Sequence, residues 1–131
     1  MSFGQSPLAE IEGLFSEWNK ALVSGDPDKV VRLYATNAIL LPTLSNKPRT
    51  SHAEIRDYFA KTFMPCGPSG TIVKAYVRVF ADVAICSGIF AFTFSDQSAA
   101  QVRKSFVYRW NGEEWLIVEH HSSLMPEQPV A

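Results

Sequence analysis

The sequence predicts an α+β fold, in which three helices come first and an antiparallel sheet follows. In the first half, apolar residues recur at three- and four-residue spacing, which is the pattern of helices that bury one face. In the second half, four strand-like runs are separated by turn sequences, and Asn111-Gly112 is a strong hairpin signal. A chain whose helices and strands are segregated in this way is typical of an α+β domain.

Each predicted helix has a recognisable start. Ser6-Pro7 supplies an N-cap and a proline suited to the first helical position. Asp26-Pro27 starts the second helix, and Tyr34 lies on its apolar stripe. The capping box Ser51-His52-Ala53-Glu54 starts the third helix. A short apolar strand, 38–41, is expected between the second and third helices.

The sheet that follows is predicted to have strands at 71–80, 83–95, 101–110 and 115–123. The second of these strands is apolar on both faces, because Phe90, Phe92 and Phe94 alternate with Ile89 and Ala91. Three helices can cover only one face of the sheet. Aromatic side chains on the other face either shield the backbone or meet a second subunit. We therefore expect a homodimer or a higher homo-oligomer, and favour the dimer.

The bulk properties indicate one domain spanning 1–131, with an ordered core at about 6–127. The 131 residues are 47% hydrophobic and carry a net charge of -1, which gives no electrostatic reason to expect nucleic acid or an anionic membrane as partner. The first residues lack a signal-peptide pattern, and no apolar run approaches the roughly 20 residues that span a bilayer. Cys66 and Cys86 lack a CxxC spacing, so we expect free thiols and a cytoplasmic protein.

The order of helices and strands resembles the nuclear transport factor 2 fold, a cone of helices against a curved sheet. Within that fold, the chain resembles bacterial relatives of the association (hub) domain of calcium/calmodulin-dependent protein kinase II. The resemblance covers about residues 8–127. It is carried by Trp18-Asn19-Lys20-Ala21-Leu22, Ser24-Gly25-Asp26-Pro27, the run from Leu40 to Asn46, Arg103 with Phe106-Val107-Tyr108-Arg109, Trp115, and His120-His121-Ser122-Ser123-Leu124-Met125-Pro126.

This resemblance implies a domain that assembles subunits and does not catalyse a reaction. Kinase activity is not expected, since the chain has no Gly-rich loop, His-Arg-Asp or Asp-Phe-Gly sequence. Hub domains also carry a deep pocket lined by arginines. Counting back from the hairpin places Ser105 where one pocket arginine of the hub sits, with Arg103 two residues earlier on the same face. Phe90 and Ser122 appear at other such places, so an anion in this pocket would meet fewer or displaced arginines.

Two adjacent histidines in the last strand are candidates for binding or catalysis. Neighbouring residues on a strand point to opposite faces, so His120 and His121 cannot share one metal ion, and no metal site is expected. One histidine should face the cone interior and the other the outer sheet face. Glu119 and His121 share a face, and a carboxylate that orients an imidazole is a usable general base. The simpler interpretation is a surface or interface ion pair.

A small organic or carboxylate ligand is expected in the cone, and no cofactor. The candidate ligand-binding residues are Trp18, Tyr34, Arg103, Ser105, Tyr108, His120, His121 and Ser122. Arg103 could clamp a carboxylate with two hydrogen bonds, although an ordinary surface arginine is as plausible. Trp18 and Tyr34 are aromatic residues on inward stripes, and such residues are more often core than ligand contacts.

The sequence leaves two functions open. The first is a non-catalytic, homo-oligomeric association-type domain with a small-molecule pocket in the cone. The second is a small isomerase, cyclase or dehydratase that acts on a hydrophobic substrate, with His121 or His120 as base and Arg103 or Tyr108 as electrostatic partner. Enzymes of this fold use an inward acid, and no Asp is confidently placed in the interior here. We therefore favour the non-catalytic function.

Overall fold

The computed structural model describes residues 7–127, and the predicted N-cap at Ser6 lies outside them. The helices and strands follow the predicted order of helices first and sheet afterwards. They are α1 (Pro7–Val23), α2 (Pro27–Val31), β1 (Tyr34–Leu41), α3 (His52–Tyr58) with its π-helical extension η1 (Phe59–Phe63) and the 3-10 turn η2 (Met64–Cys66), β2 (Ser69–Phe80), β3 (Val83–Thr93), β4 (Ala99–Trp110) and β5 (Trp115–Leu124). The α+β prediction is confirmed.

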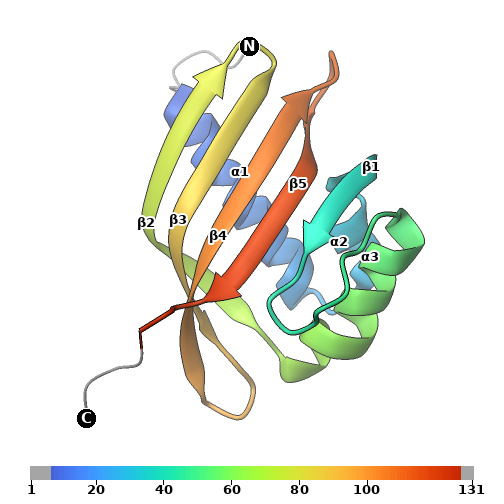
Figure 1. Cartoon of the computed structure of the whole chain (residues 1–131), viewed down its shortest axis with the longest axis vertical. Helices are drawn as coiled ribbons and strands as arrows, with labels where there is room; N and C mark the ends of the chain where they lie inside the picture. The colour runs from blue at the N-terminus through green and yellow to red at the C-terminus, as the bar shows by residue number, and fades with distance from the viewer. Residues whose placement is uncertain (1–6, 128–131) are drawn as a thin grey trace.

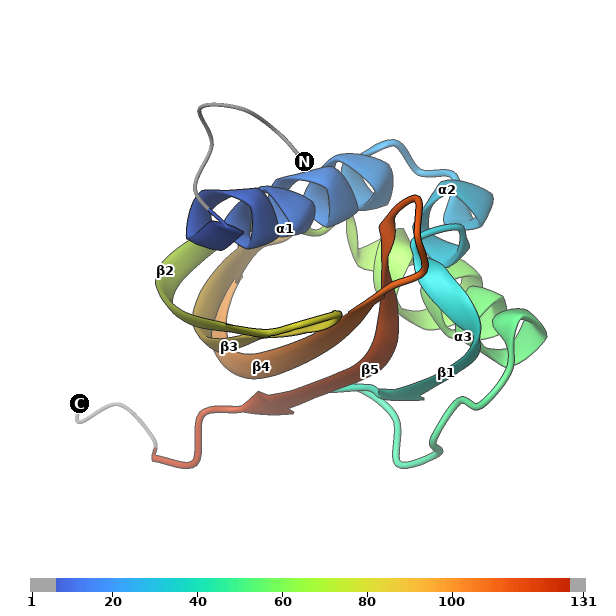
Figure 2. The ribbon, with the colours of Figure 1, turned by 90° about the horizontal axis from the view of Figure 1, so that it is seen from above.

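The five strands form one curved sheet in the order β1-β5-β4-β3-β2. Strands β2 to β5 are an antiparallel meander, as predicted, but β1 pairs with β5 in parallel, so the sheet is mixed rather than purely antiparallel. In Figure 1, α1 runs diagonally behind the sheet, and α2 and α3 lie beside β1. Figure 2 shows the sheet bending around α1, with α3 closing one end of the cone.

The first strand begins earlier than predicted and takes Tyr34 out of the second helix. Helix α2 ends at Val31, and the amide of Ile117 in β5 donates to the carbonyl of Leu33 over 2.9 Å. Tyr34 is the first residue of β1 and lies opposite Ile117. The helical stripe predicted for Tyr34 is therefore wrong, because pairing with a strand some eighty residues later overrides the local helical pattern.

The concave face of the sheet and the helices enclose an aromatic core. Phe15 and Trp18 of α1 contact Phe90 and Phe106 of the sheet, with ring centroids 4.8 to 6.3 Å apart. All four side chains are buried. Offset and edge-on ring pairs of this kind add to the hydrophobic stabilisation that burial itself supplies. Helix α1 and the concave face of the sheet therefore share one aromatic core.

A bulge in β5 determines which of its residues face the cone. The register between β4 and β5 shifts between Val107 and Tyr108, whose partners are Glu119 and Ile117, so Val118 is the extra residue. Strict alternation would place Ile117 and His120 on opposite faces, yet both are buried. The bulge therefore resets the strand, with the result that His120 and Ser122 face inward, while Glu119, His121 and Ser123 belong to the outer face.

Candidate functional site

A cavity of about 160 Å³ lies between the end of α1, the α3–η1 segment and the concave face of the sheet. Its walls are almost entirely aromatic or aliphatic, and they include Trp18, Leu40, Phe59, Phe63, Phe92 and Val102. The polar side chains in the lining are those of Thr43, Tyr58, Lys104, His120 and Ser122. A concave apolar site with a few convergent polar groups is the usual form of a small-molecule pocket.

A hydrogen-bonded chain of three buried side chains leads from α1 to β5. Trp18 Nε1–H donates to the hydroxyl oxygen of Tyr34 over 3.1 Å, and that hydroxyl lies 2.7 Å from His120 Nδ1. An indole nitrogen can only donate, which leaves the Tyr34 hydroxyl proton for His120. We assign Nδ1 as the acceptor, because the opposite tautomer would leave that hydroxyl proton without a partner among the described residues. In neutral His120 the ring proton therefore sits on Nε2. Tyr34 is held in place from outside by His52, whose Nε2 lies 2.8 Å from its carbonyl oxygen.

His120 is kept neutral and has one unused nitrogen. Its side chain is 3% exposed, and burial, followed by the nearby charges of Lys104 and His121, holds its pKa well below the usual histidine range. Nε2 is buried without a hydrogen-bond partner in the described part of the chain. Buried polar atoms are rarely left unpaired, and those that are commonly mark a place where a ligand or water binds. His120 thus offers one N–H donor inside the cone.

Lys104 is the only lysine among the buried residues that the structure describes. Its Nζ lies 3.8 Å from the centroid of the Trp18 ring, 4.9 Å from that of Phe92 and 5.1 Å from that of Phe106. Within 7–127, Lys104 forms no ion pair and no Asp or Glu is buried. Burial therefore lowers the pKa of Lys104 far below its ordinary value, since the faces of three rings compensate only part of the cost of burying an ammonium group.

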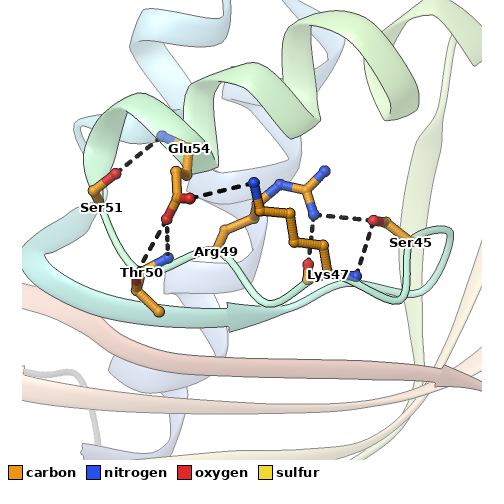
Figure 3. A network of polar contacts seen from close by, with 6 residues as sticks. All are labelled: Ser45, Lys47, Arg49, Thr50, Ser51 and Glu54. Atoms are coloured by element: carbon orange, nitrogen blue, oxygen red, sulfur yellow. Dashed lines mark hydrogen bonds and ion pairs between the residues drawn. The ribbon is translucent and has the colours of Figure 1, made fainter.

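The loop between β1 and α3 contributes Pro42, Thr43 and Leu44 to the cavity lining, and a polar network farther along this loop is shown in Figure 3. Thr43 Oγ1 donates to Ser122 Oγ at the cavity wall. Farther along the loop, Arg49 donates to Ser45 Oγ over 3.0 Å and also to the Lys47 carbonyl oxygen. The backbone of Arg49 also exchanges two hydrogen bonds of 2.8 Å with Leu40 of β1.

The same loop is fastened to the start of α3 by the predicted capping box. Ser51 Oγ accepts a hydrogen bond from the amide of Glu54 over 3.2 Å. Glu54 in turn accepts from the Thr50 amide over 2.9 Å and lies 3.6 Å from Lys47 Nζ, as drawn in Figure 3. These contacts connect the loop between β1 and α3 to the start of α3, so this loop has a defined position beside the cavity.

The structure separates the predicted ligand-binding residues into an inner and an outer group. Trp18, Tyr34, His120, Ser122 and Tyr108 are buried inside the cone. The first four line the cavity or bond to its lining, whereas Tyr108 lies in the core outside the cavity lining, with its hydroxyl unpartnered and its pKa raised by burial. The expectation that one histidine faces inward and the other outward agrees with this placement.

The outer group does not reach the cavity. Arg103, Ser105 and His121 line a shallow groove on the outer sheet face instead, and Glu119 is exposed on that face. Arg103 lies outside the cavity, because odd-numbered residues of β4 face outward at this point, so this placement fits the alternative of a surface arginine better than a clamp inside the cone. The Glu119–His121 pair shares a face, as predicted, but that face is not part of the cavity.

Lys104 is the charged cavity residue that the sequence did not lead us to expect. The sequence placed Phe106 and Tyr108 on one shared face of β4, which the structure buries, and Lys104 has the same parity. The signal was therefore present in the alternation Val102, Lys104, Phe106, Tyr108. Lysine is rarely buried in proteins, so a lysine in a strand is ordinarily expected on the exposed face.

The cone, its internal cavity and the inward polar residues of β4 and β5 define the class of the protein, which is the nuclear transport factor 2-like fold. Solved structures of that fold agree. A nuclear transport factor 2-like superfamily protein from Salmonella enterica is 18% identical, covers 92% of each chain and superposes with a TM-score of 0.76. A provisionally assigned ketosteroid isomerase from Parabacteroides distasonis is 23% identical over 93% of this chain and 94% of the other, with a TM-score of 0.73.

The family is narrower than the fold. The sequence model named "Calcium/calmodulin dependent protein kinase II association domain" matches residues 8–126, so the chain belongs to that family. A crystal structure from Xanthomonas campestris, provisionally assigned to the same association domain, is 39% identical, covers 98% of this chain and 94% of that chain, and has a TM-score of 0.90. None of the curated proteins compared with the chain matches it.

Proposed function

We propose that this protein is a non-catalytic, homo-oligomeric association-type domain that binds a small organic molecule inside its cone. The observation that carries the pocket is that one apolar cavity holds both the unpartnered His120 Nε2 and the Lys104 amine, which has no ion-pair partner within 7–127. Burying such groups is costly unless something pairs with them. A ligand with an apolar body and one polar end would supply the missing partner.

A carboxylate is the polar end that matches these donors best. Lys104 and the Nε2–H of His120 are donors in the same lining, and Ser122 contributes a hydroxyl. A negative charge within a few ångströms favours the charged form of an amine, so carboxylate binding would raise the pKa of Lys104. Binding is therefore expected to take up about one proton at a pH where the empty cavity holds a neutral amine.

The outer face of the sheet supports the oligomer. Tyr76 and Phe80 of β2 are 58% and 57% exposed, and Ile85 and Ile89 flank them on β3. Apolar side chains gathered on one sheet face commonly mark a protein interface. Association domains in this family generally self-assemble, which favours a second copy of the chain as the partner. A dimer formed through this face is the simplest closed assembly.

Two measurements test the proposal separately. Light scattering at tens of micromolar should give the mass of a dimer or larger assembly for the wild type and a smaller mass for Tyr76→Asp, which places a charge among the exposed apolar side chains of the outer face. A monomeric wild type would refute the association role.

Calorimetry with benzoate in two buffers of different ionisation enthalpy tests the pocket. Proton uptake should accompany binding, and Lys104→Met should abolish binding while Lys74→Met, at an exposed lysine of β2, should not. Benzoate binding that is absent, or that survives in Lys104→Met, would refute the proposed pocket chemistry.

The hydrogen-bond chain argues against the alternative enzyme with a histidine base. His120 is the inward histidine, but Tyr34 donates to its Nδ1, so the nitrogen free inside the cone carries a proton. That nitrogen can donate to a ligand and cannot remove a proton from one without losing the Tyr34 hydrogen bond. Its position therefore supports binding or polarising a ligand rather than deprotonating it.

A further inference from the structure

The Lys104 side chain has the surroundings of a reactive amine rather than of a structural cation. It sits among the faces of Trp18, Phe92 and Phe106, and no carboxylate is buried in 7–127 to hold its charge. Its cross-strand partner is Ser122, whose side chain also lies in the cavity lining. A neutral lysine amine is a nucleophile, whereas the ammonium form is not, and desolvation by an apolar pocket is a known way to favour the neutral form.

The second requirement of amine chemistry is a donor that polarises the electrophile. His120 lies two residue pairs along the same two strands, opposite Phe106, and its ring stacks on Phe106 at 4.4 Å between centroids. Because Tyr34 occupies Nδ1, the unpartnered Nε2 carries the hydrogen. A neutral imidazole N–H held in an apolar site can donate to a carbonyl oxygen without giving up its proton.

From this arrangement we propose that Lys104 Nζ forms a reversible imine with a small aldehyde or ketone that has an apolar body, while His120 Nε2–H donates to its carbonyl oxygen. The inference rests on the cavity of the proposed function and names a covalent mode of binding there. The apolar lining selects the body of the ligand, and the cavity of about 160 Å³ limits it to the size of a short aliphatic chain or a single ring.

The atoms balance without an oxidant or reductant. The nitrogen lone pair forms a bond to the carbonyl carbon, the π electrons move to oxygen, and one amine proton is transferred to that oxygen to give a carbinolamine. The C–O bond then breaks, the second amine proton leaves with the hydroxyl group as water, and a C=N bond remains. One water is released for each imine formed, and hydrolysis returns the amine and the carbonyl compound.

Reductive trapping tests this proposal directly. The protein is incubated at pH 7 with propanal or with benzaldehyde in the presence of cyanoborohydride, and the adducts are located by peptide mass mapping. An ordinary exposed lysine amine is neutral to only about 0.04% at this pH, so the Lys104 adduct should form roughly 100-fold or more faster than the adduct at exposed Lys74. Lys104→Met should lose this adduct, and Lys74→Met should keep it.

The role of His120 has its own variant. His120→Phe keeps an aromatic ring next to Phe106 but removes the donor, so trapping at Lys104 should slow by roughly tenfold or more. An unchanged rate would overturn the role of His120. Adducts confined to exposed lysines, with none at Lys104 for either aldehyde, would overturn the imine itself. Neither result would by itself contradict the proposed function, because that function is tested by oligomer mass and by non-covalent benzoate binding.

Discussion

Replacing Lys104 with methionine should stabilise the protein, and by an amount that depends on pH. Methionine has nearly the same length and no charge, so it fills the same space among Trp18, Phe92 and Phe106 without a buried amine. The wild-type protein must instead fold with an amine whose pKa burial has lowered. Exchanging buried charged groups for apolar ones of similar volume is often neutral or stabilising by about 1–4 kcal/mol.

The pH dependence follows from the direction of the pKa shift. In the unfolded chain Lys104 titrates near pH 10.4, whereas the folded protein holds the amine neutral to a much lower pH. Between these two values the unfolded state binds one more proton, so wild-type stability rises by about 1.4 kcal/mol per pH unit from this group. Methionine does not titrate. Its stabilising effect should therefore shrink as the pH rises from 7 to 9, by up to about 3 kcal/mol.

Urea unfolding at equal protein concentration, at pH 7, 8 and 9, measures this difference. His120 faces the same cavity from β5, but an unfolded histidine is already largely neutral above pH 7, so it contributes little in this range. Tyr34, Tyr58 and the other titrating groups are present in both proteins and cancel in the difference. Lys74→Met, which removes an exposed lysine, should show no slope. A slope of zero for Lys104→Met would show that the three rings keep Lys104 charged, and the argument for a neutral amine would fail.

Tyr34→Phe should lower the free energy of unfolding in urea by roughly 2–4 kcal/mol, because it leaves both Trp18 Nε1 and His120 Nδ1 without a partner. Tyr76→Phe on the surface should change it by no more than about 0.5 kcal/mol. Equal costs for the two variants would mean that the hydrogen-bond chain contributes nothing to stability. Gly88→Ala should either abolish the native circular dichroism spectrum or lower the free energy of unfolding by several kcal/mol, because the new Cβ would lie 1.9 Å from the Lys74 carbonyl oxygen. Gly13→Ala, at an open position of α1, should instead raise the free energy of unfolding by up to about 1 kcal/mol.

The parts of the fold that depend on local signals could be predicted from the sequence. The proline and capping-box starts of the helices, and the Asn-Gly hairpin between β4 and β5, act over a few residues, and each appears where it was expected. The start of strand β1 could not be placed in this way. Its first residue, Tyr34, is fixed by pairing with Ile117, and no local pattern contains that information.

The site was predicted less well for two reasons that the structure makes clear. The bulge at Val118 resets the facing of β5, and a sequence with apolar residues at 116, 117 and 118 gives no sign of which one is extra. Lys104 differs, because its parity with Phe106 was visible. The alternation of β4 indicated a buried position for Lys104, whereas the general preference of lysine for solvent indicated an exposed one. Functional sites are expected at positions where two such local rules disagree.

The two antiparallel strands β4 and β5 serve two surfaces at once, since their alternation sends successive residues to opposite faces. Lys104 and His120 point into the cone, while their neighbours Arg103 and His121 line the outer groove. A substitution should therefore change only the properties that depend on the face where its side chain lies. Changes at the inner pair should alter ligand binding and the pH dependence of stability while leaving oligomer mass unchanged. Changes at the outer pair should alter mass and leave aldehyde trapping intact. Effects that failed to separate in this way would mean that the curved sheet transmits strain between its faces, because paired strands otherwise hold each side chain independently of its neighbour.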